Sequence, residues 1–196
     1  MLVDIVILPP PEIRRKIGRT IKRSVGKSPA FFVVENQRLI PHLSLWHLRI
    51  SANEIGNLIE ELKRAVKGQK PIKVSSAGFR MHPKYKGDVE FTVRENEALI
   101  KLQKKILEVS LPFKSGTMPP FAAKWTGRKA EEARQYGRPL GFSPHFTMGW
   151  LKKEADALWV VKKMSNVRFS FFARNIYLCE INRWWQVRKV VGEIRF

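Results

Sequence analysis

The hydrophobic positions of the chain follow two spacings, one typical of strands and the other of helices. Residues 2–8 are almost wholly apolar, which predicts a buried strand, and the prolines that follow end it. From Pro11 to Gly26, and again from Ile55 to Gly68, apolar residues recur about every fourth position. Each of these two segments is therefore predicted to be a helix with one buried face.

The remaining segments complete a mixed pattern of helices and strands. Ser51 and Glu54 have the spacing of a capping box at the start of the second helix. Apolar spacing and turn residues predict strands over residues 30–34, 39–50, 71–80, 89–94, 142–150, 167–181 and 185–196, and helices over 95–109 and 154–164. Because hairpins replace regular parallel crossovers, we expect an α+β fold built on antiparallel sheets.

One short pattern occurs twice in this sequence of predicted elements. Residues 41–45 read Pro-His-Leu-Ser-Leu and residues 144–148 read Pro-His-Phe-Thr-Met, so both have the form Pro-His-apolar-hydroxyl-apolar. At this composition a given histidine is followed by apolar, hydroxyl and apolar residues with a probability of roughly 2%. Two matches among four histidines therefore indicate two related strands, and with them a duplicated chain of two similar halves.

The strand period decides where these side chains point. In an extended chain His42 and Ser44 face one way, and the second copy repeats this with His145 and Thr147. His47 lies five positions beyond His42 and is expected on the opposite face, in a structural role. Two explanations of the repeat stay open here: a shared chemical site, or two strands that each bury one histidine and one hydroxyl.

The charge of the chain points to a polyanionic partner. Lys and Arg number 37 against 17 Asp and Glu, a formal net charge of +20. Basic residues are spread along the whole sequence rather than gathered on one amphipathic helix or beside an apolar span, which favours nucleic acid over a membrane. The alternative is a basic surface that only keeps the protein in solution.

Residues 111–140 interrupt the regular spacing with prolines and glycines, and we expect them to form an irregular basic and aromatic insertion before the second motif. Interleaved cations and aromatic rings suit single-stranded nucleic acid, because cations neutralise phosphates and rings stack on bases. The candidates in and beyond this segment are Lys124, Trp125, Arg128, Tyr136, Arg138 and Lys152. The alternative is that its aromatic residues only anchor the loop, with residues 128–135 a solvated helical turn.

Several other classes of protein are excluded. The single cysteine, Cys179, lies in an apolar run and predicts a packed thiol and a reducing, cytoplasmic location. Residues 2–8 contain an acid and lack a basic leader, so we expect neither a signal peptide nor a membrane helix. Metal-binding histidine and cysteine patterns, acidic magnesium clusters and glycine-rich phosphate loops are missing from the sequence, so we expect no metal and no cofactor.

Two imidazoles, each beside a hydroxyl, suit displacement at phosphorus. One histidine takes a proton from the attacking oxygen and the other gives a proton to the leaving oxygen, while Ser44 and Thr147 donate hydrogen bonds to the phosphate. Histidine serves both roles because its ordinary pKa of about 6.5 populates both forms near neutrality. Which histidine is the base depends on the direction of the reaction.

The paired motifs His42-Leu43-Ser44-Leu45 and His145-Phe146-Thr147-Met148 resemble those of the two-histidine (2H) phosphoesterase superfamily, and within it the 2′-5′ RNA ligase, or LigT-like, group. The resemblance covers nearly the whole chain. It implies one domain over residues 1–196, made of two pseudo-symmetric lobes whose two antiparallel sheets, flanked by helices, surround a central cleft. It also implies His42 and His145 as catalytic residues and Ser44 and Thr147 as phosphate-binding residues, without a metal.

The implied activity is metal-independent processing of RNA ends that carry a 2′,3′-cyclic phosphate or a 2′-5′ phosphodiester, by a monomer whose partner is RNA or a nucleotide with a cyclic phosphate. For opening a cyclic phosphate to a 2′-phosphate, we expect His145 as the base and His42 as the acid. The alternative is a non-catalytic RNA-binding protein on the same scaffold. One residue departs from the group's pattern: Trp150 stands where an arginine commonly helps to hold the phosphate. Lys152 or a basic residue of the segment 111–140 is the expected replacement.

Overall fold

The chain folds into two antiparallel sheets. The computed structural model describes residues 1–119 and 125–196. One sheet has four strands in the order β3 (Leu43–Arg49), β1 (Leu2–Ile7), β8 (Asn175–Ile181) and β9 (Val187–Arg195). The other has five strands in the order β2 (Ala30–Val33), β6 (His145–Leu151), β5 (Asp88–Val93), β4 (Ile72–Met81) and β7 (Ser170–Ala173). The two histidine motifs thus begin β3 and β6, one strand in each sheet.

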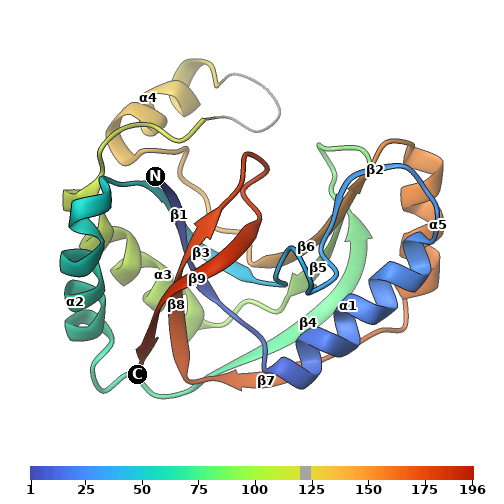
Figure 1. Cartoon of the computed structure of the whole chain (residues 1–196), viewed down its shortest axis with the longest axis horizontal. Coiled ribbons are helices and arrows are strands. Elements are labelled where there is room, and N and C mark those ends of the chain that lie inside the picture. The colour runs from blue at the N-terminus through green and yellow to red at the C-terminus, as the bar shows by residue number, and fades with distance from the viewer. Residues whose placement is uncertain (120–124) are drawn as a thin grey trace.

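Helices flank these sheets at two ends of the molecule (Figure 1). Two of them contact the four-stranded sheet, with α2 (Ile55–Val66) against β9 and α3 (Glu97–Ser110) against β3. At the other end α5 (Glu154–Met164) packs on the five-stranded sheet, with α1 (Pro11–Val25) beside it. Two short 3₁₀ turns, η1 (Ala52–Glu54) and η2 (Leu111–Phe113), and helix α4 (Gly127–Tyr136) complete the described elements.

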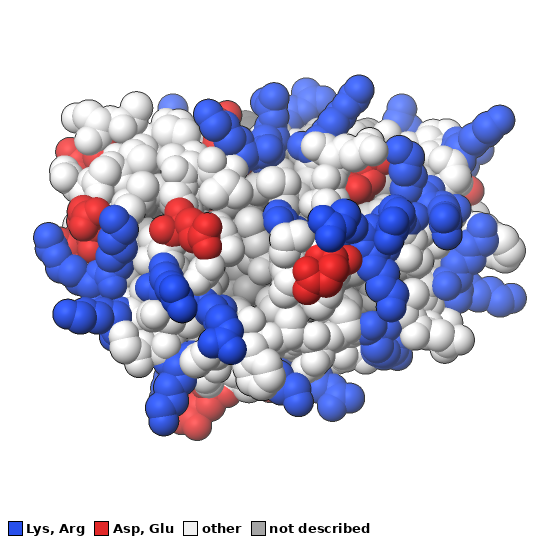
Figure 2. Space-filling view, turned by 60° about the horizontal axis from the view of Figure 1, so that its bottom comes forward, with Lys and Arg blue, Asp and Glu red and all other residues white. Residues whose placement is uncertain are grey.

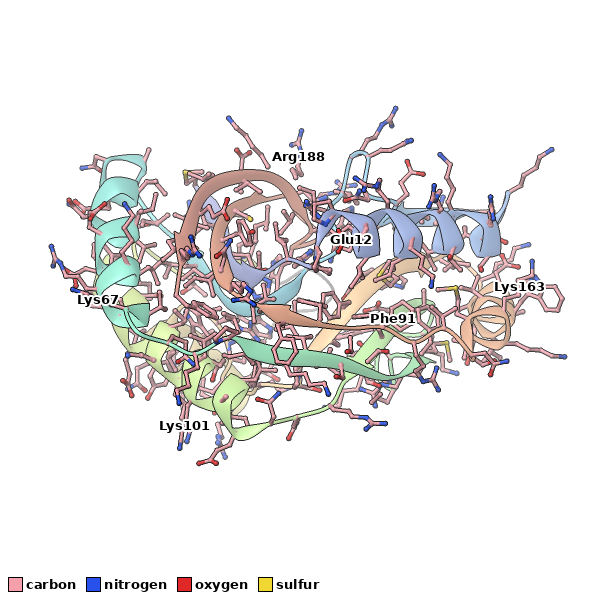
Figure 3. All side chains as sticks on the ribbon, turned by 90° about the horizontal axis from the view of Figure 1, so that it is seen from below. Glu12, Lys67, Phe91, Lys101, Lys163 and Arg188 are labelled. Carbon is pink, nitrogen blue, oxygen red and sulfur yellow. The ribbon has the colours of Figure 1, made fainter. Side chains whose placement is uncertain are left out.

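Apolar side chains with the predicted spacing attach the helices to the sheets. On α1, Ile17 and Ile21 are buried, and on α2, Leu58 and Leu62 are buried. Full burial of such a side chain contributes roughly 1.5–3 kcal/mol. Figure 3 shows Phe91 of β5 in the interior, where it is fully buried. The cores of the two sheets are therefore built from the residues whose periodicity predicted the elements.

The α+β class, the two antiparallel sheets and the flanking helices are confirmed, and the structure corrects several details. Ser51 and Glu54 do not form a capping box, because no side chain caps α2 and the chain enters it through η1. The predicted strand over 167–181 is two strands, β7 and β8, which belong to different sheets. Cys179 is buried, as predicted. None of the described helices has both the length and the apolarity needed to cross a membrane.

Each motif strand contains a β-bulge in the same place. In the β1–β3 pair Trp46 lies opposite Ile5 and Ser44 opposite Val6, so Leu45 is an extra residue. In the β5–β6 pair Gly149 lies opposite Val89 and Thr147 opposite Glu90, so the extra residue follows the hydroxyl again. A bulge of this kind bends the strand and reverses the alternation of faces beyond it.

Candidate active site

The two motif strands line a single cleft of about 460 Å³. All four predicted motif side chains border it, and the structure adds residues from the loops on either side. The polar lining includes His42, Ser44, His47, Arg138, His145 and Thr147. The sequence therefore predicted correctly that the two distant motifs meet at one place.

The two motif histidines are held in the same way. Nδ1 of His42 lies 2.7 Å from the backbone oxygen of Ile40, and Nδ1 of His145 lies 2.7 Å from the backbone oxygen of Ser143. A carbonyl oxygen only accepts hydrogen bonds, so Nδ1 carries the proton in each ring. Nε2 is thus the nitrogen of each imidazole that can take up and release a proton.

A buried carboxylate lies near each Nε2 atom. The distance from His42 Nε2 to Asp4 Oδ2 is 3.7 Å, and that from His145 Nε2 to Glu90 Oε2 is 3.8 Å. Glu90 also receives a hydrogen bond of 2.8 Å from Nε of Arg80. A carboxylate at this distance favours the protonated imidazole and so stabilises the charge that forms when the ring accepts a proton.

The two motif histidines differ in how deeply they are buried. The side chain of His42 is 4% exposed, whereas that of His145 is 35% exposed. Burial lowers the pKa of His42 below its ordinary value of 6.5, against the opposite effect of Asp4, and a charge on His145 lowers it further. His42 is therefore the imidazole held neutral near pH 7, which suits a proton acceptor.

His47 was predicted on the opposite face of its strand, and that prediction is wrong. The bulge at Leu45 reverses the alternation, so His47 borders the cleft with Ser44, and its Nε2 lies 3.4 Å from the Ser44 hydroxyl. His47 Nε2 is also 3.1 Å from Asp4 Oδ2. A one-residue change of register moves every later side chain to the other face, and periodicity alone does not reveal it.

Arg138 completes a chain of hydrogen bonds through His47. Its guanidinium lies over the rings of Trp46 and Trp185, at 5.1 and 5.7 Å from their centroids, and donates to His47 Nδ1 at 2.7 Å. Because Nδ1 of His47 accepts this bond, its proton is on Nε2 and is donated to Asp4. Burial also lowers the pKa of His47, which agrees with a neutral ring between the cation and the carboxylate.

The hydroxyls of the two motifs differ in their partners. Ser44 donates its proton to Asp4 Oδ2 at 2.6 Å, so in this state the proton is not directed at a substrate. Thr147 borders the same cleft. Ser44, His47 and Asp4 do not form a protease-like triad, because the carboxylate and the hydroxyl both approach Nε2 of His47 while its Nδ1 faces Arg138.

The other predicted RNA-binding residues differ in where they lie relative to the cleft. Trp125 borders the cleft with its ring 6.1 Å from that of Trp185. Arg128 is exposed and pairs with Glu132 on α4, Tyr136 packs against the main core, and Lys152 is outside the lining of the cleft. Lys124 lies outside the described residues. The helix α4 itself matches the helical alternative for residues 128–135.

Reasoning from sequence missed the carboxylates of Asp4 and Glu90, and it treated Trp150 only as a departure from the motif pattern of the LigT-like group. A charged residue within the apolar run 2–8 was a usable signal for Asp4. Trp150 donates from Nε1 to the backbone oxygen of Lys86 at 3.0 Å, and it lies opposite Asp88 as His47 lies opposite Asp4. Burial raises the pKa of Asp88 to about 7, and the Glu90 charge adds to the effect.

Comparison with known proteins finds this architecture among solved structures. No protein-family model matches the sequence, and no curated protein sequence matches it. Among solved structures, TT0787 of Thermus thermophilus superposes with a TM-score of 0.66 at 16% identity, covering 100% of this chain and 97% of that one. E. coli LigT, solved with 3′-AMP, gives 0.62 at 16% identity, covering 99% and 97%.

A third structure extends the comparison. Usb1 of Kluyveromyces marxianus superposes with a TM-score of 0.57 at 11% identity, covering 100% of this chain and 98% of that one. These likenesses extend over the full chain on both sides and therefore compare whole folds, not a shared fragment. The architecture that the resemblance implied is thereby confirmed: from end to end the chain has the LigT-like fold, shared with LigT and Usb1.

Proposed function

We propose that this protein is a metal-independent RNA end-processing phosphoesterase that acts on 2′,3′-cyclic phosphate or 2′-5′ phosphodiester ends. The observation that carries the proposal is the matched pair of His42 and His145 in one cleft, each with Nδ1 fixed by a carbonyl and a carboxylate near Nε2. Two such imidazoles are the groups that an in-line displacement at phosphorus needs. A protein that only bound RNA would have no use for both.

We assign the roles of base and acid from the difference in burial between the two histidines. His42, held neutral, takes the proton of an attacking water at Nε2 as the new P–O bond forms. His145, the more exposed of the two, gives its Nε2 proton to the ribose oxygen as the P–O bond of the ring breaks. The product is a phosphate monoester beside a free hydroxyl. This reverses the order expected from sequence, because the sequence did not show which imidazole is buried.

Arg138 supplies the positive charge that Trp150 cannot. It borders the cleft, and the rings of Trp46 and Trp185 together with His47 hold its guanidinium in place. A fixed guanidinium binds phosphate oxygens well because its N–H groups are planar and preorganised. In this proposal the cation of the site comes from the segment before the second motif, rather than from the end of the motif strand.

The surface outside the cleft supports a polyanionic substrate. Figure 2 shows Lys and Arg side chains over much of the visible face and projecting from its edges, with few acidic side chains between them. Figure 3 labels Lys101 on α3, Lys163 on α5 and Lys67 directly after α2, in three separate parts of the molecule. A positive field of this extent attracts nucleic acid from several directions. E. coli LigT, of the same fold, was solved with 3′-AMP and with phosphate.

Turnover of a nucleoside 2′,3′-cyclic phosphate in EDTA tests the proposal. We expect the wild-type protein to open the ring, and His42→Ala and His145→Ala to lose turnover by about a thousandfold while keeping their affinity for RNA. His82→Ala is the matched control, since His82 also borders the cleft but belongs to neither motif. Nδ1 of His82 accepts from the backbone N–H groups of Lys84 and Tyr85 in the turn between β4 and β5, so this variant should keep most of the activity.

Two results would contradict the proposal. If the wild-type protein binds RNA but opens neither cyclic phosphates nor 2′-5′ linkages, the protein is a binding module on this scaffold. If turnover requires an added divalent metal, the two imidazoles are not the complete acid and base. RNA affinity should also fall steeply as salt is raised, because phosphate contacts release counterions.

A further inference from the structure

Three aromatic rings meet beside the cleft. They are Phe31 of β2, Trp150 of β6 and Trp184 of the turn between β8 and β9, which we call the aromatic cluster. Their centroids lie 5.3 Å apart for Phe31 and Trp150, and 5.5 Å apart for each of the other two pairs. Three elements far apart in the sequence thus place large apolar faces at one point.

The cluster is neither buried nor scattered over the surface. Phe31 is 48% exposed, and Trp150 and Trp184 are half-buried. The hydrogen bond from Trp150 Nε1 to the backbone oxygen of Lys86 holds one of the rings in position. Grouped aromatic surface left in water costs free energy that burial against a ligand would recover.

The position of the cluster shows which part of a substrate it can reach. Trp184 borders the cleft, whereas Phe31 does not. The cluster therefore extends from the wall of the cleft outwards. A nucleotide whose phosphate lies between His42 and His145 fills the cleft itself, so a ring system that stacks on Phe31 belongs to the neighbouring nucleotide.

Two cations lie on the rings of this cluster. Nζ of Lys152 is 5.7 Å from the centroid of Phe31, and the guanidinium carbon of Arg183 is 4.9 Å from the centroid of Trp184. Aromatic faces beside cations are the combination that binds single-stranded nucleic acid, since the rings stack on bases and the cations neutralise the phosphates that join them.

We propose that the aromatic cluster is a nucleobase subsite, which binds the penultimate base of a single-stranded RNA whose terminal phosphate lies between the two histidines. This inference rests on the proposed function for the identity of the substrate. It assigns Lys152 and Arg183 to the phosphate that joins the last two nucleotides. It also gives Trp150 a role in substrate choice at the position where the arginine was expected.

The test compares a dinucleotide with a mononucleotide, each ending in a 2′,3′-cyclic phosphate. The mononucleotide has no penultimate base. For Phe31→Ala, whose ring lies outside the lining of the cleft, we expect kcat/KM to fall about tenfold on the dinucleotide, in line with the loss of one base–aromatic stack, and to stay unchanged on the mononucleotide. Trp184→Ala also changes the wall of the cleft, so it should lose more activity on the dinucleotide than on the mononucleotide. Trp159→Ala is the matched control: its ring is 53% exposed, carries Lys163 at 4.8 Å, and lies outside the lining of the cleft.

An abasic dinucleotide separates stacking from structure. If the first base is removed from the substrate, the wild-type protein should lose the same factor of about ten, and Phe31→Ala should lose nothing more. The subsite is disproved if each variant loses the same factor on both substrates, or if Phe31→Ala still loses activity on the abasic substrate. Either result would mean that the rings only support the fold.

Binding distinguishes failure of the subsite from failure of the proposed function. The affinity of an uncleavable dinucleotide with a terminal 2′-phosphate can be followed by tryptophan fluorescence. If no substrate is turned over but both variants bind this dinucleotide about tenfold more weakly, the proposed function fails and the subsite stands. If the wild-type protein turns over both substrates and the variants match it in turnover and binding, the function stands and the subsite fails. No binding and no turnover would overturn both.

Discussion

The two sides of the cleft have the same plan but different surroundings. The first half-site consists of His42, Ser44, His47 and Asp4, and the second half-site consists of His145, Thr147, Trp150 and Glu90. Both have a histidine bonded to the carbonyl two residues earlier, a hydroxyl two residues later, a bulge after the hydroxyl and a buried carboxylate. The shared part positions Nε2 of each imidazole, and it is the part that the paired motifs encode.

The part that differs sets the chemistry of each half-site. In the first, Asp4 receives hydrogen bonds from Ser44 and His47, and Arg138 extends the network. In the second, Glu90 pairs with Arg80, whose side chain is 48% exposed, and an aromatic cluster replaces further charges. Under the proposed function the two half-sites divide the roles: the closed, charged first half-site holds the phosphate and accepts the proton, and the open, aromatic second half-site donates the proton and contacts the RNA.

The largest effect expected from this division is a difference between the two histidine variants when the leaving group is changed. A nitrophenyl phosphodiester of a nucleotide releases nitrophenolate, which departs without a proton. His145→Ala should then regain most of the activity that it lacks on a cyclic phosphate, because the acid is no longer needed, while His42→Ala should stay about a thousandfold below the wild type. Comparing kcat/KM on the two substrates measures the difference.

Equal recovery of both variants would mean that neither histidine has a fixed role. Recovery of His42→Ala alone would restore the order expected from sequence. Melting temperatures and RNA affinity of both variants serve as controls, since loss of fold would lower activity on every substrate.

The second effect concerns stability and compares the two carboxylates. Asp4→Asn removes the carboxylate from a buried network that contains Arg138, so we expect the free energy of unfolding at neutral pH to fall by about 3 kcal/mol. Glu90→Gln should cost only about 1 kcal/mol, because Arg80 is half-exposed and can turn to water. Urea titration of the two variants measures both values. A larger cost for Glu90→Gln would show that the first half-site is not the more tightly coupled one.

Particular residues show how much of the site can be predicted from the sequence. Alternation placed His42 with Ser44 correctly because the bulge lies beyond them, and it failed at His47 because one extra residue reverses all later faces. Asp4 was overlooked as a site residue because it lies within a run that predicts a buried strand. The bond from Arg138 to His47 joins residues 91 positions apart, and such a pair depends on where a loop settles over the sheet. Local spacing therefore predicts the shared plan, whereas tertiary packing decides the differences.

The third effect concerns the stability contributions of Asp4, which lies opposite His47, and Asp88, which lies opposite Trp150. Oδ1 of each carboxylate is buried without a partner among the described residues, but Asp4 accepts hydrogen bonds at Oδ2 from Ser44 and His47. Burial raises the pKa of Asp88 to about 7 from 3.8. A raised pKa in the folded state contributes stability below the ordinary pKa, and that contribution is lost as pH rises toward 7. Asp88→Asn should therefore stabilise the protein by on the order of 2 kcal/mol at about pH 8 and much less at about pH 4. Denaturant titrations at both pH values measure this, and a benefit that does not grow with pH would contradict it.

The smallest effect distinguishes the two hydroxyls. Both hydroxyls border the cleft, but Ser44 gives its proton to Asp4 at 2.6 Å and so has none to offer a phosphate oxygen in this state. Thr147→Ala should lower kcat/KM on a cyclic phosphate by about tenfold through loss of one hydrogen bond to a charged oxygen, and Thr147→Ser should restore it. Ser44→Ala should change kcat/KM by no more than about twofold and instead lower the melting temperature, because Asp4 loses a donor. If Ser44→Ala lowers kcat/KM as much as Thr147→Ala does, the Ser44 hydroxyl must turn from Asp4 to the substrate during the reaction, and the two half-sites would then hold the phosphate symmetrically.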